Sequence, residues 1–241
     1  MNPFTTLPRL ADFIFELHVF NKNAKALQKL RDEGRIEEEK ALIQKGQKTF
    51  IENLSRKAKL TYDITGEENI PAEGPFMVYS NHQSYADIFA LIWLFRNHCQ
   101  MGYVAKDEWR KLKPLATAII YTRSIFLIRG NAKEAVKSLK EAKDLLDQGF
   151  NLVIFPEGTR SRKHEMGEFK SGAFKFAEKG KVPILPVTLD GGYHLIEETG
   201  SYQPTNVRIT VHPLVHIEKM DKHEQKEAYE QIEQQIRSAL D

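Results

Sequence analysis

From residue 60 onward, short apolar runs alternate with longer stretches of helical periodicity. The runs are rich in branched and aromatic residues and predict strands near 60–65, 76–80, 101–105, 124–128, 151–155, 182–188 and 207–216. Helices are expected near 85–97, 107–120, 131–148, 170–179 and 222–240. This alternation is typical of an α/β fold, with a mostly parallel or mixed sheet flanked by helices. The strict apolar and polar alternation of 207–212 predicts an exposed or antiparallel edge strand.

Residues 1–59 carry a different pattern, in which apolar residues recur at three- and four-residue steps. This spacing predicts amphipathic helices over 8–33 and 36–58, with Gly34 ending the first of them. Two helices joined in this way form a hairpin. Its apolar stripe either packs against the main domain as core, which composition favours, or lies among lipid headgroups. The densest part of the stripe comprises Phe13, Ile14, Phe15, Leu17, Val19 and Phe20.

Composition narrows the class of protein. Hydrophobic residues make up 41% of the 241 residues, which suits a packed core and excludes wholesale disorder. The single cysteine, Cys99, excludes an intramolecular disulfide, fits a reducing compartment and is expected to be a buried bystander. No run approaches the ~18 apolar residues that a membrane span needs. Asp12 and Glu16 also interrupt the one signal-peptide candidate.

The net charge of +2 is unevenly spread along the chain. Residues 1–60 hold 12 Lys and Arg against 8 Asp and Glu, a balance of +4 that leaves −2 for the rest. This asymmetry suits an anionic membrane surface better than nucleic acid, which usually binds a stronger basic patch with interleaved aromatic residues. We therefore expect a cytoplasmic protein with no nucleic-acid partner, which lies on the surface of any membrane that it meets.

A polar cluster, Asn-His-Gln-Ser-Tyr-Ala-Asp at 81–87, directly follows a predicted strand. A histidine beside an orienting carboxylate can act as a general base toward a hydroxyl. His82 and Asp87 are too far apart in angle to meet within one helix, but they can meet if only Asp87 is helical. Asn81 and Ser84 are suitable N-cap residues for such a helix. Alternatively, Asp87 only favours the helix start and His82 is an incidental loop histidine.

A second polar segment, Phe-Pro-Glu-Gly-Thr-Arg-Ser at 155–161, also follows a predicted strand. Arginine offers planar, bidentate recognition of phosphate, so Arg160 is a candidate anion ligand. Alternatively, Glu157 and Arg160 form a structural ion pair of little energetic weight. Lys106 and Arg129 follow two further predicted strands. Ligands bind beyond the carboxyl ends of strands in open α/β sheets, so these residues share one edge of the sheet if their strands are parallel.

Other enzyme signatures are missing from the sequence. It contains no Gly-x-Ser-x-Gly elbow, no Gly-x-Gly-x-x-Gly and no Walker loop. The segment from His164 to Glu168 lacks the second histidine of a zinc-binding helix. His212 and His216 are expected to flank a turn. We therefore expect no metal site.

Four segments together resemble the signature blocks of the glycerolipid acyltransferases, in the same order along the chain. They are 81–87, 125–129, 155–161 and 182–187, and Ser124 stands where a glycine is expected before the second block. The stretch 167–175 is similar to the bacterial branch that acts on 1-acylglycerol-3-phosphate. The resemblance implies a catalytic pair and a set of substrate-binding residues. The pair is His82 and Asp87, and the substrate-binding residues are Glu157, Gly158, Thr159, Arg160, Arg129 and, less sharply defined, Lys106.

The resemblance also implies a function. A fatty acyl group would pass from an acyl thioester to the free 2-hydroxyl of 1-acylglycerol-3-phosphate, giving phosphatidic acid. The donor is acyl-carrier protein or acyl-CoA as co-substrate, with no cofactor. Glycerol-3-phosphate or another lysophospholipid remains an alternative acceptor, and a non-catalytic lipid-binding module is the alternative of another class.

A lipid substrate also shifts the expected domain roles. Residues 1–59 become a membrane-surface anchor and 60–241 the α/β acyltransferase domain. The protein is then expected as a peripheral, monotopic protein on the cytoplasmic face of the cell membrane, next to anionic lipid.

Overall fold

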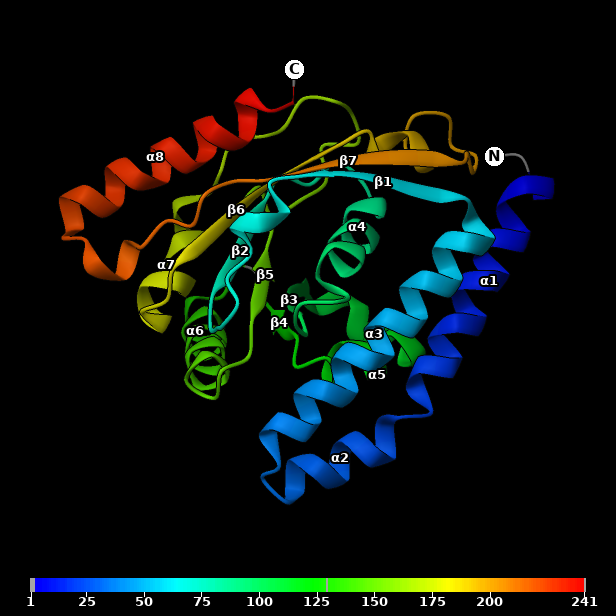
Figure 1. Cartoon of the computed structure of the whole chain (residues 1–241), viewed down its shortest axis with the longest axis horizontal. Coiled ribbons are helices and arrows are strands. Elements are labelled where there is room, and N and C mark those ends of the chain that lie inside the picture. The colour runs from blue at the N-terminus through cyan, green and yellow to red at the C-terminus, as the bar shows by residue number, and fades with distance from the viewer. Residues whose placement is uncertain (1–2, 129, 241) are drawn as a thin grey trace.

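The computed structural model describes residues 3–128 and 130–240. Over these residues, seven strands form one sheet in the order β1-β7-β6-β2-β5-β3-β4 (Figure 1). The strands are β1 (Leu60–Thr65), β2 (Met77–Ser80), β3 (Gly102–Lys106), β4 (Ile125–Leu127), β5 (Leu152–Ile154), β6 (Ile184–Asp190) and β7 (Thr205–Val211). All seven predicted strands are therefore present, most of them shorter than expected.

Helices cover both faces of this sheet. The α-helices are α1 (Pro3–Asn21), α2 (Ala24–Asp32), α3 (Ile36–Ala58), α4 (Ala86–Phe95), α5 (Lys113–Tyr121), α6 (Ala132–Asp147), α7 (Ser171–Gly180) and α8 (Lys222–Ser238). Short 3-10 helices are η1 (Glu67–Asn69), η2 (Asp107–Lys111), η3 (Gly192–Leu195) and η4 (Ile217–Lys219). In Figure 1, α6, α7 and α8 lie on one side of the central strands, and α1, α3 and α4 lie on the other.

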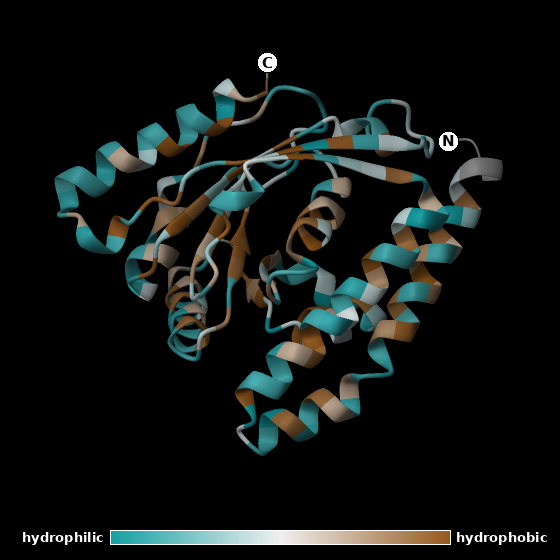
Figure 2. Cartoon of the chain, viewed as in Figure 1, coloured by the Kyte–Doolittle hydropathy of each residue, from teal (hydrophilic) through white to brown (hydrophobic). Residues whose placement is uncertain are grey.

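Two buried clusters hold these layers together. One packs α1, α3 and α4 against the sheet, and the other packs α6, α7 and α8 against its opposite face. On β2, Val78 belongs to the first cluster, whereas its neighbours Met77 and Tyr79 belong to the second. Successive strand residues point to opposite faces, so a strand covered on both sides must be apolar throughout. Figure 2 shows this for the central strands β5 and β6, which are brown over most of their length.

Strand direction fixes where the polar segments lie. The strands β2, β3, β4, β5 and β6 are mutually parallel. Their carboxyl ends therefore share one edge of the sheet, which is the condition for the predicted site residues to lie near one another. β7 runs antiparallel to β6, and β1 runs parallel to β7. The sheet is thus mixed, with the reversed pair at one end.

Two local predictions need correction. The alternating segment at 207–212 is antiparallel to β6 but is not an edge strand, because β1 pairs along its other side. The expected helix over 107–120 begins as the 3-10 helix η2 and becomes α-helical only at Lys113, next to a proline at the first turn. Proline suits that position because its missing N–H has no acceptor there.

The N-terminal hairpin has a break that the periodicity does not predict. The expected helix over 8–33 is divided into α1 and α2 by a turn at Lys22 and Asn23. Beyond it Gly34, with φ of 67°, ends α2, and α3 follows as predicted. α1 lies against α3 at Gly46, where a Cβ atom would approach the Phe20 ring to 2.8 Å. This close approach requires a glycine.

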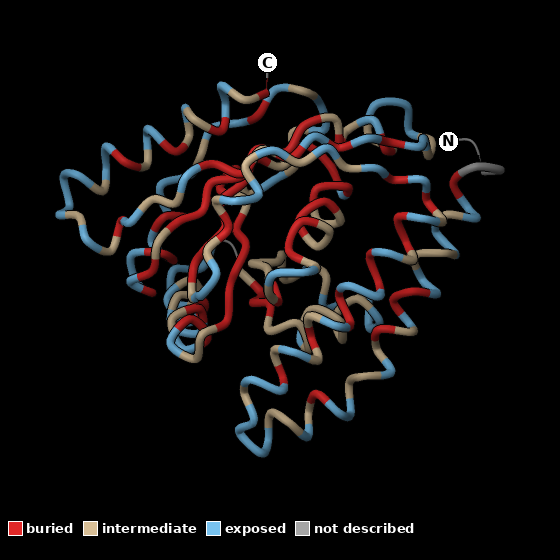
Figure 3. Tube along the Cα trace, in the orientation of Figure 1, coloured by how far each residue is buried: buried red, intermediate tan, exposed pale blue. Residues whose placement is uncertain are grey.

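The apolar stripe of α1 is divided between core and surface. Leu17 and Phe20 are buried in the cluster that α1 shares with the sheet, and Phe13 packs against Phe50 and Phe89. By contrast, four apolar residues are more than half exposed or nearly so, namely Leu7, Leu10, Ile14 and Phe15. Buried and exposed residues alternate along α1 in Figure 3. Phe13 and Phe20 therefore stabilise the fold. Of the densest part of the predicted stripe, Ile14 and Phe15 are exposed, whereas Leu17 and Phe20 are buried.

Candidate active site

His82 and Asp87 form a hydrogen-bonded pair at the carboxyl edge of the sheet. His82 lies in the loop after β2, Asp87 lies in the first turn of α4, and His82 Nδ1 is 2.8 Å from Asp87 Oδ2. The backbone amide of Ser84 also donates to Oδ2, at 2.7 Å. The side chain of His82 is 14% exposed, whereas that of Asp87 is fully buried. A buried carboxylate thus orients a histidine that solvent and a substrate can reach.

The expected N-cap role of Asn81 is wrong. Its side-chain amide instead donates to the Leu189 carbonyl at 2.7 Å and accepts from the Leu189 amide at 2.8 Å. These two bonds join the start of the His82 loop to β6. Ser84 does act at the helix start, because its hydroxyl oxygen accepts from the Ala86 amide at 2.9 Å.

Burial raises the pKa of the Asp87 carboxyl above its ordinary value, and the hydrogen bond from His82 offsets only part of that rise. Among the described residues, no hydrogen-bond partner meets its second oxygen, Oδ1. Gly192 packs directly against this oxygen, since a Cβ there would lie 2.6 Å from Oδ1. The carboxylate is therefore tightly enclosed, and the hydrogen bonds from His82 and Ser84 both reach the same oxygen, Oδ2.

The segment after β5 forms the other wall of the site. The Phe155 ring stacks on the His82 ring, with centroids 4.0 Å apart and planes 13° apart. The Glu157 carboxylate accepts from the backbone amides of His82 at 2.6 Å and Gly167 at 2.7 Å. Burial raises the pKa of Glu157 above its ordinary value. Within the structure, Glu157 thus contacts the backbone that carries His82.

Arg160 does not pair with Glu157, as the alternative interpretation of the sequence required. Its Nη1 donates to Glu197 Oε1 at 2.7 Å, and its guanidinium carbon lies 3.6 Å from the centroid of the Tyr85 ring. The Arg160 side chain is 18% exposed. Sequence reasoning missed Glu197, because it lies 37 residues beyond Arg160 and outside any recognised block.

Gly158, Thr159 and Lys106 lie at the same carboxyl edge of the sheet. Gly158 adopts a positive φ of 71°, which favours glycine, and Thr159 is exposed. Lys106 is the last residue of β3 and lies 3.7 Å from Glu108, with its side chain 40% exposed. Arg129 lies outside the described residues.

The fold and site together define an α/β protein with a His–Asp pair and an arginine at the carboxyl edge of its sheet. A family model described as Acyltransferase matches residues 61–190, and the chain belongs to this acyltransferase family. The matched range contains the His82–Asp87 pair and the segment at 155–161.

Individual relatives agree with this family. A 1-acyl-sn-glycerol-3-phosphate acyltransferase of Borreliella burgdorferi is 30% identical over 179 residues, covering 74% of this chain and 71% of the relative. A chloroplastic protein of the same name from Arabidopsis thaliana is 34% identical, covering 66% of this chain and 45% of its own. The chain spans about half the length of several curated relatives that it matches, from Brassica napus, Arabidopsis thaliana and Chlamydomonas reinhardtii.

The fold comparison covers more of the chain. The crystal structure of the 1-acyl-sn-glycerophosphate acyltransferase PlsC from Thermotoga maritima superposes with a TM-score of 0.78 at 27% identity. The superposition covers 100% of this chain and 96% of the Thermotoga maritima chain, so the structural similarity includes the N-terminal helices.

Proposed function

We propose that this protein transfers a fatty acyl group from an acyl thioester to the free 2-hydroxyl of 1-acylglycerol-3-phosphate, giving phosphatidic acid. The observation that carries the proposal is the 2.8 Å hydrogen bond between His82 and Asp87 at the carboxyl edge of the sheet. The names of the matched relatives support the choice of acceptor.

His82 acts as the general base. Its Nδ1–H donates to Asp87, which leaves Nε2 free of its proton and able to accept one. As the acceptor oxygen attacks the thioester carbonyl carbon, its proton passes to Nε2, and Asp87 stabilises the imidazolium. The carbon–sulfur bond then breaks, and His82 returns the proton to the leaving thiolate. The reaction is balanced without a cofactor.

Arg160 binds the acceptor phosphate, because it is partly exposed, permanently charged and on the same edge as His82. Arg129 is proposed as its partner from the sequence resemblance, and Gly158 and Thr159 as neighbours of the acceptor. Lys106 adds positive charge along the same edge. Acyl-carrier protein or acyl-CoA supplies the acyl group.

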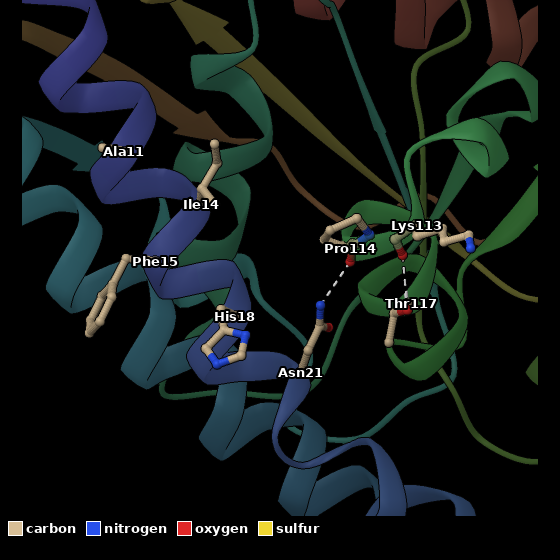
Figure 4. A pocket seen from close by; sticks show the side chains of 8 residues that line it. All are labelled: Ala11, Ile14, Phe15, His18, Asn21, Lys113, Pro114 and Thr117. Atoms are coloured by element: carbon tan, nitrogen blue, oxygen red, sulfur yellow. Dashed lines mark hydrogen bonds between the residues drawn. The ribbon is translucent and has the colours of Figure 1, made fainter.

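The membrane contact is proposed at the exposed stripe of α1, where Leu7, Leu10, Ile14 and Phe15 are 50% to 58% exposed. Apolar side chains on a helix surface bind at the boundary of headgroups and acyl chains. The stripe borders a groove of about 710 Å³ between α1 and α5, lined by Ala11, Ile14, Phe15, His18, Asn21, Lys113, Pro114 and Thr117 (Figure 4). Basic side chains next to such a surface favour anionic lipid. We propose the cytoplasmic face of the membrane as the location of this contact.

Within the described residues, no helix has the length and apolarity to cross a bilayer.

The test is release of free thiol from acyl-CoA or acyl-carrier protein by the purified protein, with 1-acylglycerol-3-phosphate, with glycerol-3-phosphate and with no acceptor. Release should depend on the lysophospholipid, and His82→Ala should lower turnover about 10² to 10⁴-fold. His223→Ala is the matched control, since that side chain is 83% exposed. Equal turnover by the His82 variant would reject the base, and no transfer to any acceptor would favour a lipid-binding module.

A further inference from the structure

The segment that follows β6 touches both halves of the site. Asp190 ends β6 at the carboxyl edge, and the chain turns at Gly191, with φ of 85°, into η3. Gly192 lies against Asp87, and Glu197 follows two residues after η3. This segment contributes no residue to the catalytic pair or to the polar segment at 155–161, yet it contacts both.

The Glu197 carboxylate joins two loops through one oxygen. Its Oε1 accepts from the Tyr85 backbone amide at 3.1 Å and from Arg160 Nη1 at 2.7 Å. The side chain is 3% exposed, and among the described residues its Oε2 has no hydrogen-bond partner. Burying a carboxylate costs free energy unless an opposite charge and hydrogen bonds compensate for the lost water. For Glu197, the Arg160 guanidinium provides this compensation.

Arg160 is constrained in two directions as a result. Glu197 holds one edge of the guanidinium, and the Tyr85 ring covers one face at 3.6 Å. Tyr85 is in turn packed edge-on against Trp109, with ring centroids 6.2 Å apart. A free arginine side chain loses considerable rotamer entropy when it binds a ligand, and holding it beforehand removes part of that cost. The guanidinium carries five N–H donors, so one bond to Glu197 leaves donors for an anion.

We propose that Glu197 is a positioning residue that orients Arg160 for the phosphate of the acceptor, with Tyr85 as the second support. The inference rests on the proposed function, because it takes the anion at Arg160 to be the acceptor phosphate. Glu197 then determines how strongly the protein prefers a phosphorylated acceptor, without touching the reacting atoms.

The test compares Glu197→Ala and Glu197→Gln with Glu198→Gln. Glu198 is the matched control, because it is 51% exposed and pairs with His194 at 2.6 Å. Each protein is assayed on 1-oleoylglycerol-3-phosphate and on 1-oleoylglycerol, which lacks the phosphate. Glu197→Ala should raise KM for the phosphorylated acceptor about tenfold, with kcat nearly unchanged. Without Glu197, Arg160 is no longer held toward the phosphate, and its charge-assisted contact with that phosphate is weakened. Glu197→Gln should lose less, since its amide oxygen can still accept from Arg160. Neither substitution should change use of 1-oleoylglycerol, and Glu198→Gln should resemble the parent protein.

A double-mutant cycle with Arg160→Ala separates positioning from a structural role. If Glu197 acts through Arg160, the double variant should be no worse than Arg160→Ala alone. The inference is overturned if the activity losses of the two single variants multiply in the double variant. It is also overturned if Glu197→Ala loses activity equally on both acceptors, or if its KM for the phosphorylated acceptor falls. If Arg160→Ala weakens use of the phosphorylated acceptor and Glu197→Ala does not, the inference fails while the proposed function stands. If Arg160→Ala affects both acceptors alike, the phosphate role of Arg160 fails, and the inference fails with it. Melting temperatures are compared throughout, and the near-isosteric Gln variant decides the result if the Ala variant does not fold.

Discussion

The side chain of Glu157 holds the backbone of His82, because one carboxylate oxygen accepts from the His82 amide at 2.6 Å. The other oxygen accepts from Gly167 at 2.7 Å, and a Cβ at Gly167 would lie 3.0 Å from it. Further backbone bonds run from Ser161 and Arg162 to the carbonyls of His82 and Gln83. The segment after β5 and the loop of the base are therefore one hydrogen-bonded unit.

Replacing Glu157 with Gln should lower kcat more than it raises KM for the acceptor. The Glu157 carboxylate accepts hydrogen bonds from two backbone amides, those of His82 and Gly167. A Gln side chain has one oxygen that can accept from one of these amides, and its NH₂ group would point its hydrogens at the other. An unmet buried amide costs about 1 to 3 kcal/mol, which is enough to displace the His82 loop. Steady-state kinetics on 1-acylglycerol-3-phosphate provide the measurement. A change confined to KM would instead favour direct contact between Glu157 and the acceptor.

Asp87→Asn should lower turnover by about 10² to 10⁴-fold, because the amide no longer selects the imidazole tautomer or stabilises the imidazolium. The same substitution should raise the free energy of unfolding at neutral pH. Burial raises the pKa of Asp87, so the folded state binds this proton more tightly than the unfolded chain does. The ionised group therefore destabilises the fold at neutral pH, and that cost disappears as the pH falls through the raised pKa.

The Asp87→Asn variant should accordingly melt at or above the temperature of the parent protein near pH 8. This advantage should shrink as the pH falls through the raised pKa of Asp87, because the parent protein then takes up its proton. Thermal unfolding of both proteins across this range is the measurement. A variant that is less stable at every pH would show that Asp87 stabilises the fold as well as the base.

Cys99→Ser should leave activity within about twofold, since small changes at bystander positions have small effects. Burial raises the pKa of the Cys99 thiol to about 12, and its sulfur lies 3.8 Å from the Met101 sulfur. Because the thiolate is the reactive form, iodoacetamide should modify the native protein slowly and the unfolded protein quickly. Rapid inactivation by iodoacetamide, with protection by acyl-CoA, would instead indicate an acyl-enzyme on this cysteine.

The exposed and buried residues of α1 should respond differently to substitution. Ile14→Ser with Phe15→Ser should release the protein from anionic vesicles and leave the melting temperature nearly unchanged, because both side chains are more than half exposed. Phe20→Ser is the contrasting variant, since Phe20 is 6% exposed and loss of a buried Phe costs about 3 to 5 kcal/mol. Vesicle flotation and thermal unfolding measure the two effects. Retained flotation of the Ile14 and Phe15 variant would place the membrane contact elsewhere.

The elements that could be predicted are those with strong local signals. Asn131 caps α6 through the amides of Lys133 and Glu134, at the start of the helix that periodicity predicts over 131–148. The loop position of His82 and the helical position of Asp87 follow from the strand that precedes them. Both features depend on residues within a few positions of each other.

The features that could not be predicted depend on contacts between distant segments. Periodicity shows that α1 has an apolar stripe, but packing on α3 decides that Phe20 is covered and Phe15 is not. The pairing of Arg160 with Glu197 arises because the end of β6 lies near the end of β5, with β2 between them. Side-chain chemistry alone suggested Glu157 as the partner, since it is three residues away.

The reversed strands β1 and β7 determine the edge of the sheet at which α1 begins. Thr205 begins β7 beside Leu60, the first residue of β1, and Arg208 of β7 lies opposite Asp190, the last residue of β6. The starts of both reversed strands therefore lie at the edge where the parallel strands end. α3 leads directly into β1, and α1 returns along α3, so the beginning of α1 lies at this edge too (Figure 1). If α1 rests on the bilayer and the acceptor is a lysophospholipid, as proposed, the membrane contact begins at the edge of the sheet that carries His82, and the acceptor can reach the base by lateral diffusion without crossing water.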